Sequence, residues 1–155
     1  MSDTRVISRS PVDLLTAEHH LFASLLEDYE HLPPMQISER TELVRRIEEE
    51  VDRHIGTEES LFYPTLLELK DPVLHERVAE VLAEHRQMEA LIDDLRHSHP
   101  GAKADLVLDV LRSLVDRHTA YEQKELFPFA SRLPRVTRNQ LGLEIEERRW
   151  REERF

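Results

Sequence analysis

Cysteine is absent from this sequence of 155 residues. Its absence excludes disulfide bonds within the sequence, thiolate-held iron–sulfur clusters and a cysteine nucleophile. Long apolar runs are also missing: no stretch approaches the roughly 18 uncharged apolar residues of a membrane span. The N-terminal segment has no apolar region typical of a secretion signal. We therefore expect a cytoplasmic protein without a membrane anchor.

Basic residues are outnumbered, with 21 Lys and Arg against 32 Asp and Glu, for a net charge of −11. Because non-specific nucleic-acid binding depends on a basic surface, we expect no nucleic-acid partner. Glycine is scarce, at 3 residues, while 34% of the residues are charged and Leu, Glu and Arg are abundant. This composition favours helices over strands, in one domain large enough to bury a core.

Helix start and stop signals divide the sequence into five helical stretches. Ser10 followed by Pro11 begins the first, and Asp71 begins the third in the same way. Pro64 and Pro128 lie close to the ends of the second and fourth stretches, where they predict a bend or an end. The expected helices are residues 10–31, 38–69, 71–97, 102–131 and 138–153.

Four long helices joined by short loops predict an all-α fold, an antiparallel up-down-up-down four-helix bundle over residues 10–131. Residues 132–155 are expected to form an additional C-terminal helix, with Thr137 as its N-cap. Apolar residues such as Leu141 and Trp150 are sparse in it. It is therefore expected to pack on the bundle or extend from it.

Two segments of the sequence match each other, HIGTEESLFYP from His54 and HTAYEQKELFP from His118. In each, a Glu follows the His by four residues, at Glu58 and Glu122. Residues four apart lie on the same face of an α-helix, so each segment presents an imidazole beside a carboxylate. That arrangement suits two ligands of one metal ion, and the sequence contains it twice.

A further histidine lies upstream of each segment at a similar distance, at His19 and His85. These six positions continue the apolar stripes of their helices; His19, for example, fills the step between Leu15 and Phe22. A polar group buried without a partner costs about 1–3 kcal/mol, so six of them need an explanation. A mutual His–Glu hydrogen-bond network is the plainer alternative, but it does not account for the identical spacing in both halves.

The donor set favours a pair of metal ions. Four imidazoles and two carboxylates exceed the needs of one tetrahedral zinc and suit two adjacent ions bridged by carboxylates. The mixture of imidazole and carboxylate fits iron best, with manganese or a zinc pair as alternatives.

This pattern resembles the hemerythrin-like cation-binding (HHE) domain family over residues 10–131. The resemblance implies a four-helix bundle that holds two iron ions, joined by an oxo or hydroxo bridge. It also implies six metal ligands: His19, His54, His85 and His118 as terminal ligands, with Glu58 and Glu122 as bridging carboxylates.

Some neighbours of these positions leave alternatives open. His20 competes with His19 for the first ligand position. Oxygen-carrying hemerythrins have a second His four residues along the third helix, where this sequence has Glu89, either an extra ligand or a partner for Arg86. The ligand set is closer to bacterial di-iron proteins that repair iron–sulfur clusters, but their Cys-containing N-terminal segment has no counterpart here. Glu59 is expected to point about 100° away from the site.

The expected function is binding or sensing of a small diatomic or redox species (dioxygen, nitric oxide or peroxide), or handling of iron. An enzyme that disproportionates peroxide or reduces nitric oxide is the alternative, and a bundle with structural metal that binds a partner is a third. No sequence feature identifies a protein partner.

Overall fold

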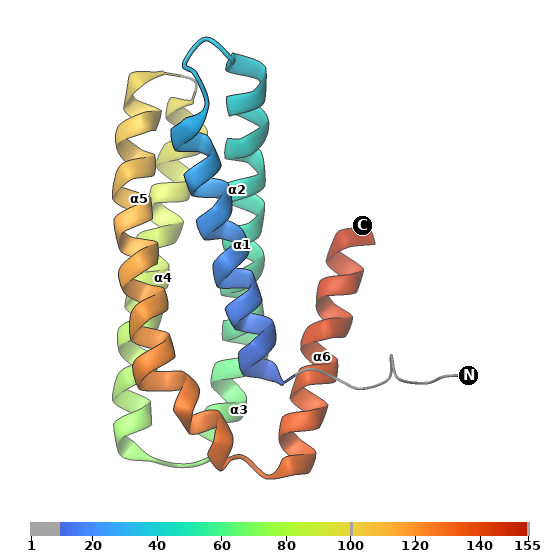
Figure 1. Ribbon diagram of the computed structural model, residues 1–155. Helices are drawn as coiled ribbons and strands as arrows, with labels where there is room; N and C mark the ends of the chain where they lie inside the picture. Colours follow the sequence, from blue (N-terminus) through green and yellow to red (C-terminus); the bar gives the residue numbers. More distant parts are fainter. Residues whose placement is uncertain (1–9, 100, 155) are drawn as a thin grey trace, which may run out of the picture.

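Four long helices lie side by side in alternating directions, as Figure 1 shows, in a computed structural model that describes residues 10–99 and 101–154. The predicted all-α four-helix bundle is confirmed. Its helices are α1 (Pro11–His31), α2 (Ile37–Thr57), α4 (Pro72–Ser98) and α5 (Ala102–Tyr121). Among the described residues, no helix is long and apolar enough to cross a membrane.

The predicted helix starts are capped by the expected side chains. Ser10 Oγ accepts a hydrogen bond from the Asp13 backbone N–H at 3.0 Å, and Pro11 occupies the first helical position of α1. Asp71 Oδ1 accepts from the Val73 N–H at 2.9 Å at the start of α4. Each cap satisfies one of the backbone donors that a helix leaves without an internal partner.

Both His–Glu segments continue into a π-helical turn, which the sequence signals did not predict. After α2 the chain passes through η2 (Glu58–Phe62) into the short helix α3 (Tyr63–Leu67). After α5 it passes through η3 (Glu122–Leu126) into the 3₁₀ helix η4 (Phe127–Arg132). A proline two residues beyond each π turn lacks the N–H that would continue α-helical bonding, and the wider turn accommodates that loss.

Each π turn begins at the glutamate of its segment. Its closing hydrogen bond joins residues five apart, from the Tyr63 N–H to the Glu58 carbonyl and from the Phe127 N–H to the Glu122 carbonyl. One extra residue per turn rotates everything beyond it by about 100° relative to an uninterrupted α-helix. The side chains that follow each glutamate therefore take directions that an α-helical reading assigns wrongly.

The apolar core consists of two clusters, with a polar layer between them. One cluster includes Phe22, Val51, Met88 and Leu111, toward the end of the bundle that holds the α1–α2 connection. The other includes Leu15, Phe62, Leu74 and Leu126, toward the opposite end. Five of the six candidate ligands occupy sequence positions between the two sets, and His54 lies at the edge of the first set, so apolar side chains enclose the polar layer from both ends.

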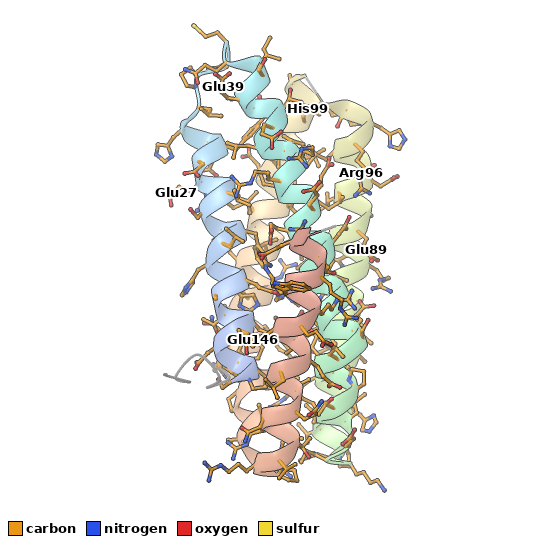
Figure 2. All side chains as sticks on the ribbon, turned by 90° about the vertical axis from the view of Figure 1, so that its right-hand side faces the viewer. Glu27, Glu39, Glu89, Arg96, His99 and Glu146 are labelled. Atoms are coloured by element: carbon orange, nitrogen blue, oxygen red, sulfur yellow. The ribbon has the colours of Figure 1, made fainter. Side chains whose placement is uncertain are left out.

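The C-terminal helix α6 (Arg135–Arg154) packs against α1, α2 and η2, and Figure 2 shows it in front of these helices. It begins after Pro134, so the predicted N-cap, Thr137, lies inside its first turn instead. Leu141 and Ile145 are buried in the second core cluster, whereas Trp150 is half exposed. The sparse apolar positions are enough to seat one face of α6 on the bundle.

Candidate metal centre

The six residues singled out in the sequence meet at one place in the bundle. They come from all four helices of the bundle and from the two π turns, and their side chains are almost completely buried. Their donor atoms form two groups that share one carboxylate, with the atoms of each group within 4.8 Å of one another. The groups are His19, His54, Glu58 and Glu122 in one, and Glu58, His85 and His118 in the other.

The two carboxylates link the two halves of the bundle. Glu58 Oε1 lies 3.1 Å from Nε2 of His54, four residues before it, and 3.0 Å from Nε2 of His85 on α4. Glu122 Oε1 lies 3.2 Å from His118 Nε2 and 3.0 Å from Nε2 of His19 on α1. Each glutamate therefore contacts one histidine of its own segment and one from the other half, as a bridging carboxylate between two ions would.

Three of the four imidazoles are held from behind by a second carboxylate. Their Nε2 atoms face the centre, while Nδ1 of each meets a glutamate oxygen at 2.7–2.8 Å. Such a carboxylate fixes the tautomer and the ring orientation of a metal-binding histidine and makes it a better donor. The pairs are His54 with Glu18, His85 with Glu59, and His118 with Glu84.

The fourth histidine, His19, breaks this symmetry. Its Nδ1 is buried without a hydrogen-bond partner among the described residues, and its ring stacks on Phe127 at 5.5 Å between centroids. In the matching segments Gln123 occupies the position of Glu59, and its side chain is exposed. The second segment therefore has no counterpart of Glu59, the carboxylate of the first segment that supports His85.

Tyr63 lies among the ligand candidates instead of only packing in the core. Its hydroxyl is within hydrogen-bond distance of Glu58 Oε1, at 2.9 Å, and of Glu122 Oε2. It also lies 3.4 Å from His85 Nε2. Burial and the two neighbouring carboxylates raise the pKa of Tyr63 well above its ordinary value, so the residue stays a neutral phenol.

The buried groups balance one another electrically in the metal-free protein. Burial alone would lower the pKa of His54 and His118, but the Glu58 and Glu122 carboxylates outweigh it and raise both pKa values. Burial would in turn raise the pKa of Glu58, and His54 outweighs it, so that the pKa falls well below the ordinary value. Burial therefore does not neutralise the Glu58 carboxylate, because the His54 and His118 imidazoles beside it favour its charged form.

The donor atoms present fit a pair of cations. Among the residues that the structure describes, Glu58 Oε2 and His118 Nε2 are buried without a hydrogen-bond partner, since the 3.2 Å contact of His118 with Glu122 is not aligned as a hydrogen bond, and the internal network thus leaves coordinating atoms free. An unpaired buried polar atom is costly, and a cation at the centre would satisfy these atoms. The set of imidazole nitrogens and carboxylate oxygens matches what iron, manganese or zinc requires.

The alternative positions lie outside the centre. The side chain of His20 is exposed, whereas His19 is 3% exposed. Glu89 pairs with Arg86 at 2.8 Å on the outer side of α4, where Figure 2 labels it. The remaining histidines are exposed or half-buried away from the centre, at His31, His75, His97 and His99.

Glu18, Glu59 and Glu84 are the functional candidates that the sequence interpretation did not identify. Glu59 was expected to point away from the site and instead reaches His85 across the α2–α4 face. A partial signal exists, because an acid directly precedes the first histidine of each half, as Glu18-His19 and Glu84-His85. In the structure each of these acids supports the histidine of the neighbouring helix.

Comparison with known proteins places these features in context. Residues 10–130 match the family described as the hemerythrin HHE cation-binding domain. No curated protein matches the chain. Among solved structures, a hemerythrin HHE cation-binding domain-containing protein from Mycobacterium kansasii superposes with a TM-score of 0.74 at 22% sequence identity, covering 90% of this chain and 85% of that one. At this identity the likeness establishes the shared fold.

Proposed function

Because the chain belongs to the hemerythrin HHE cation-binding domain family, we propose that it holds two iron ions at the six-residue centre. The proposed activity is binding or sensing of a small diatomic or redox species, such as dioxygen, nitric oxide or peroxide, or handling of the iron itself. One observation carries this proposal. Imidazole groups from four helices and two fully buried carboxylates converge on a layer that the fold otherwise reserves for apolar side chains.

Each side chain has a role that follows from its contacts. Glu58 and Glu122 would bridge the two ions, because each already spans a histidine from either half of the bundle. The four histidines would be terminal ligands through Nε2. An iron pair with open coordination positions supplies reversible binding of a small molecule or electron transfer to it.

The surrounding protein orients these ligands and excludes water. Three glutamates behind the histidines, here called the outer carboxylates (Glu18, Glu59 and Glu84), fix imidazole rings through Nδ1, which leaves Nε2 free for the metal. The two apolar clusters cover the polar layer from both ends of the bundle. The burial of the centre favours a ligand of a few atoms over a larger substrate.

Turnover of peroxide or nitric oxide is the second candidate, and Tyr63 favours it. Its hydroxyl touches both bridging candidates and carries a proton that burial keeps in place. A phenol at this position can donate a proton to a species bound beside the carboxylates. Turnover of peroxide or nitric oxide requires proton transfer, so a donor at this position supports the second candidate.

The test is metal analysis of protein loaded with iron, combined with its visible and near-ultraviolet spectrum. We expect close to two iron ions per chain and near-ultraviolet bands that shift when azide is added. One zinc per chain, with no such bands after iron loading, would refute the di-iron proposal. Peroxide and nitric oxide consumption by the loaded protein then separates turnover from reversible binding.

A further inference from the structure

The C-terminal helix lies directly on one of the two His–Glu segments. Gly56 stands inside this segment, between His54 and Glu58, where an interior glycine otherwise weakens a helix. A Cβ atom at Gly56 would lie 2.6 Å from a guanidinium nitrogen of Arg148 on α6. The glycine therefore leaves space for the Arg148 side chain of α6 beside the segment that carries two candidate ligands.

The next residue of α6, Arg149, joins the centre through one of the outer carboxylates. Its guanidinium donates to Glu18 Oε2 at 3.4 Å and to Glu50 Oε1 at 3.2 Å. The other oxygen of Glu18 faces His54 Nδ1 at 2.7 Å. Glu18 is 6% exposed, so these two partners hold most of its carboxylate.

We propose that Arg149 is a positioning residue for the metal centre, and this inference rests on the metal binding proposed above. Its guanidinium fixes one oxygen of Glu18, and the other oxygen then orients the His54 imidazole. A guanidinium suits this role because its planar fork spans two carboxylates at once, here Glu18 and Glu50. The additional helix thereby controls how firmly one half of the centre holds its ion.

The other half of the molecule has a guanidinium behind one of its histidines as well, but a more exposed one that does not come from α6: Arg86 on α4 contacts Glu59, which supports His85, and is 56% exposed. Glu84 supports His118 as Glu18 supports His54, but the nearest guanidinium, of Arg117, stands 3.9 Å from Glu84 and is mostly exposed. Arg149 is much less exposed, at 23%. The influence of α6 should therefore be confined to the ion beside His19 and His54.

A purely structural role is the competing explanation, in which Arg149 only fastens α6 to the bundle. Glu50 separates the two roles, because it binds Arg149 but does not contact the imidazoles of the centre. Glu50→Gln weakens the attachment of α6 and leaves the path from Arg149 through Glu18 to His54 intact. Arg149→Gln removes both, and Arg117→Gln is the matched control in the other half.

The experiment measures iron release from the full-length protein to a coloured chelator at neutral pH, where two ions give two phases. In Arg149→Gln we expect one phase to accelerate by roughly threefold to tenfold, which is below the ~10–100-fold effect of groups that contact a metal ligand directly because Arg149 acts through Glu18, while the other phase stays unchanged. Glu50→Gln and Arg117→Gln should release both ions at the wild-type rate. Arg149→Lys keeps the charge without the fork and should give an intermediate rate.

Several outcomes overturn the inference. Unchanged release in Arg149→Gln would do so, as would equal acceleration of both phases or the same acceleration in Glu50→Gln. If Arg149→Gln does not fold, as shown by a melt without a cooperative transition, Arg149→Lys decides the question. Iron release at the wild-type rate in Arg149→Lys also refutes the role. A wild-type protein that retains no iron would refute the proposed function itself, whereas retained iron with unaltered release refutes only the role of Arg149.

Discussion

Replacing Tyr63 with Phe tests how the centre is held together with and without metal. The substitution removes one hydroxyl and keeps the ring, so it opens no cavity in the second core cluster. The lost group lies 2.9 Å from Glu58 Oε1 and also contacts Glu122 Oε2. Both carboxylates are fully buried, at 0% exposure, so water does not replace the missing donor.

The expected cost follows from this geometry. A hydrogen bond to a charged group contributes about 1.5–3 kcal/mol to stability, and a buried acceptor left without a donor costs a similar amount. For a chain of this size, 1 kcal/mol corresponds to about 2–4 °C in melting temperature. Metal-free Tyr63→Phe should therefore melt roughly 4–10 °C below the metal-free wild type. In the loaded protein the ions satisfy the same oxygens, so the decrease should be less than half as large.

Thermal melts of chelated and iron-loaded samples, with the metal content of each measured, are the assay. Tyr121→Phe is the matched control, because Tyr121 is a half-buried tyrosine next to the second segment whose hydroxyl interacts with Glu80 and not with the centre. Its decrease should be the same with and without iron. Equal decreases for Tyr63→Phe in the two states would refute the reasoning, since Tyr63 would then matter as much to the loaded centre.

Three further predictions concern metal content, release and pH. Glu58→Ala should lower bound iron sharply while His20→Ala leaves it unchanged; elemental analysis of both variants would expose a wrong helix register. Gln123→Glu should supply the carboxylate that His19 lacks and slow release of one ion to a chelator, and faster release would contradict this. Because the pKa of His54 is raised above its ordinary 6.5, its proton stabilises the metal-free fold at low pH, and that contribution is lost as pH rises through the raised pKa. Metal binding displaces the same proton, so the melting-temperature gap between loaded and chelated protein should widen as pH rises above about 6.5; a constant gap would be the contrary result.

The helices were predictable because their signals are local. Ser10 and Asp71 act as caps in the structure as they do in the sequence pattern, and the inward stripe placed all six candidate ligands in one layer. The π turns at Glu58 and Glu122 were not predictable from the same signals, since the prolines beyond them indicate an interruption but not its form. The predicted start of α6 lies too late in the sequence, because Thr is a common N-cap residue and Thr137 fits that pattern. The helix begins at Arg135, directly after Pro134.

The outer carboxylates show where sequence periodicity stops being informative. Glu18, Glu59 and Glu84 lie beside the inward stripe, and an acid in that position has the same signature as a solvated surface residue. Their partners stand on neighbouring helices, so only the packing of the bundle reveals the contact.

The duplicated pattern predicts a symmetric centre, but Gln123 and Arg149 make its two halves unequal. One half has an unsupported histidine, His19, and a guanidinium from α6 behind its other histidine. Substitutions at Gln123 and Arg149 should therefore act first on the ion proposed for that half.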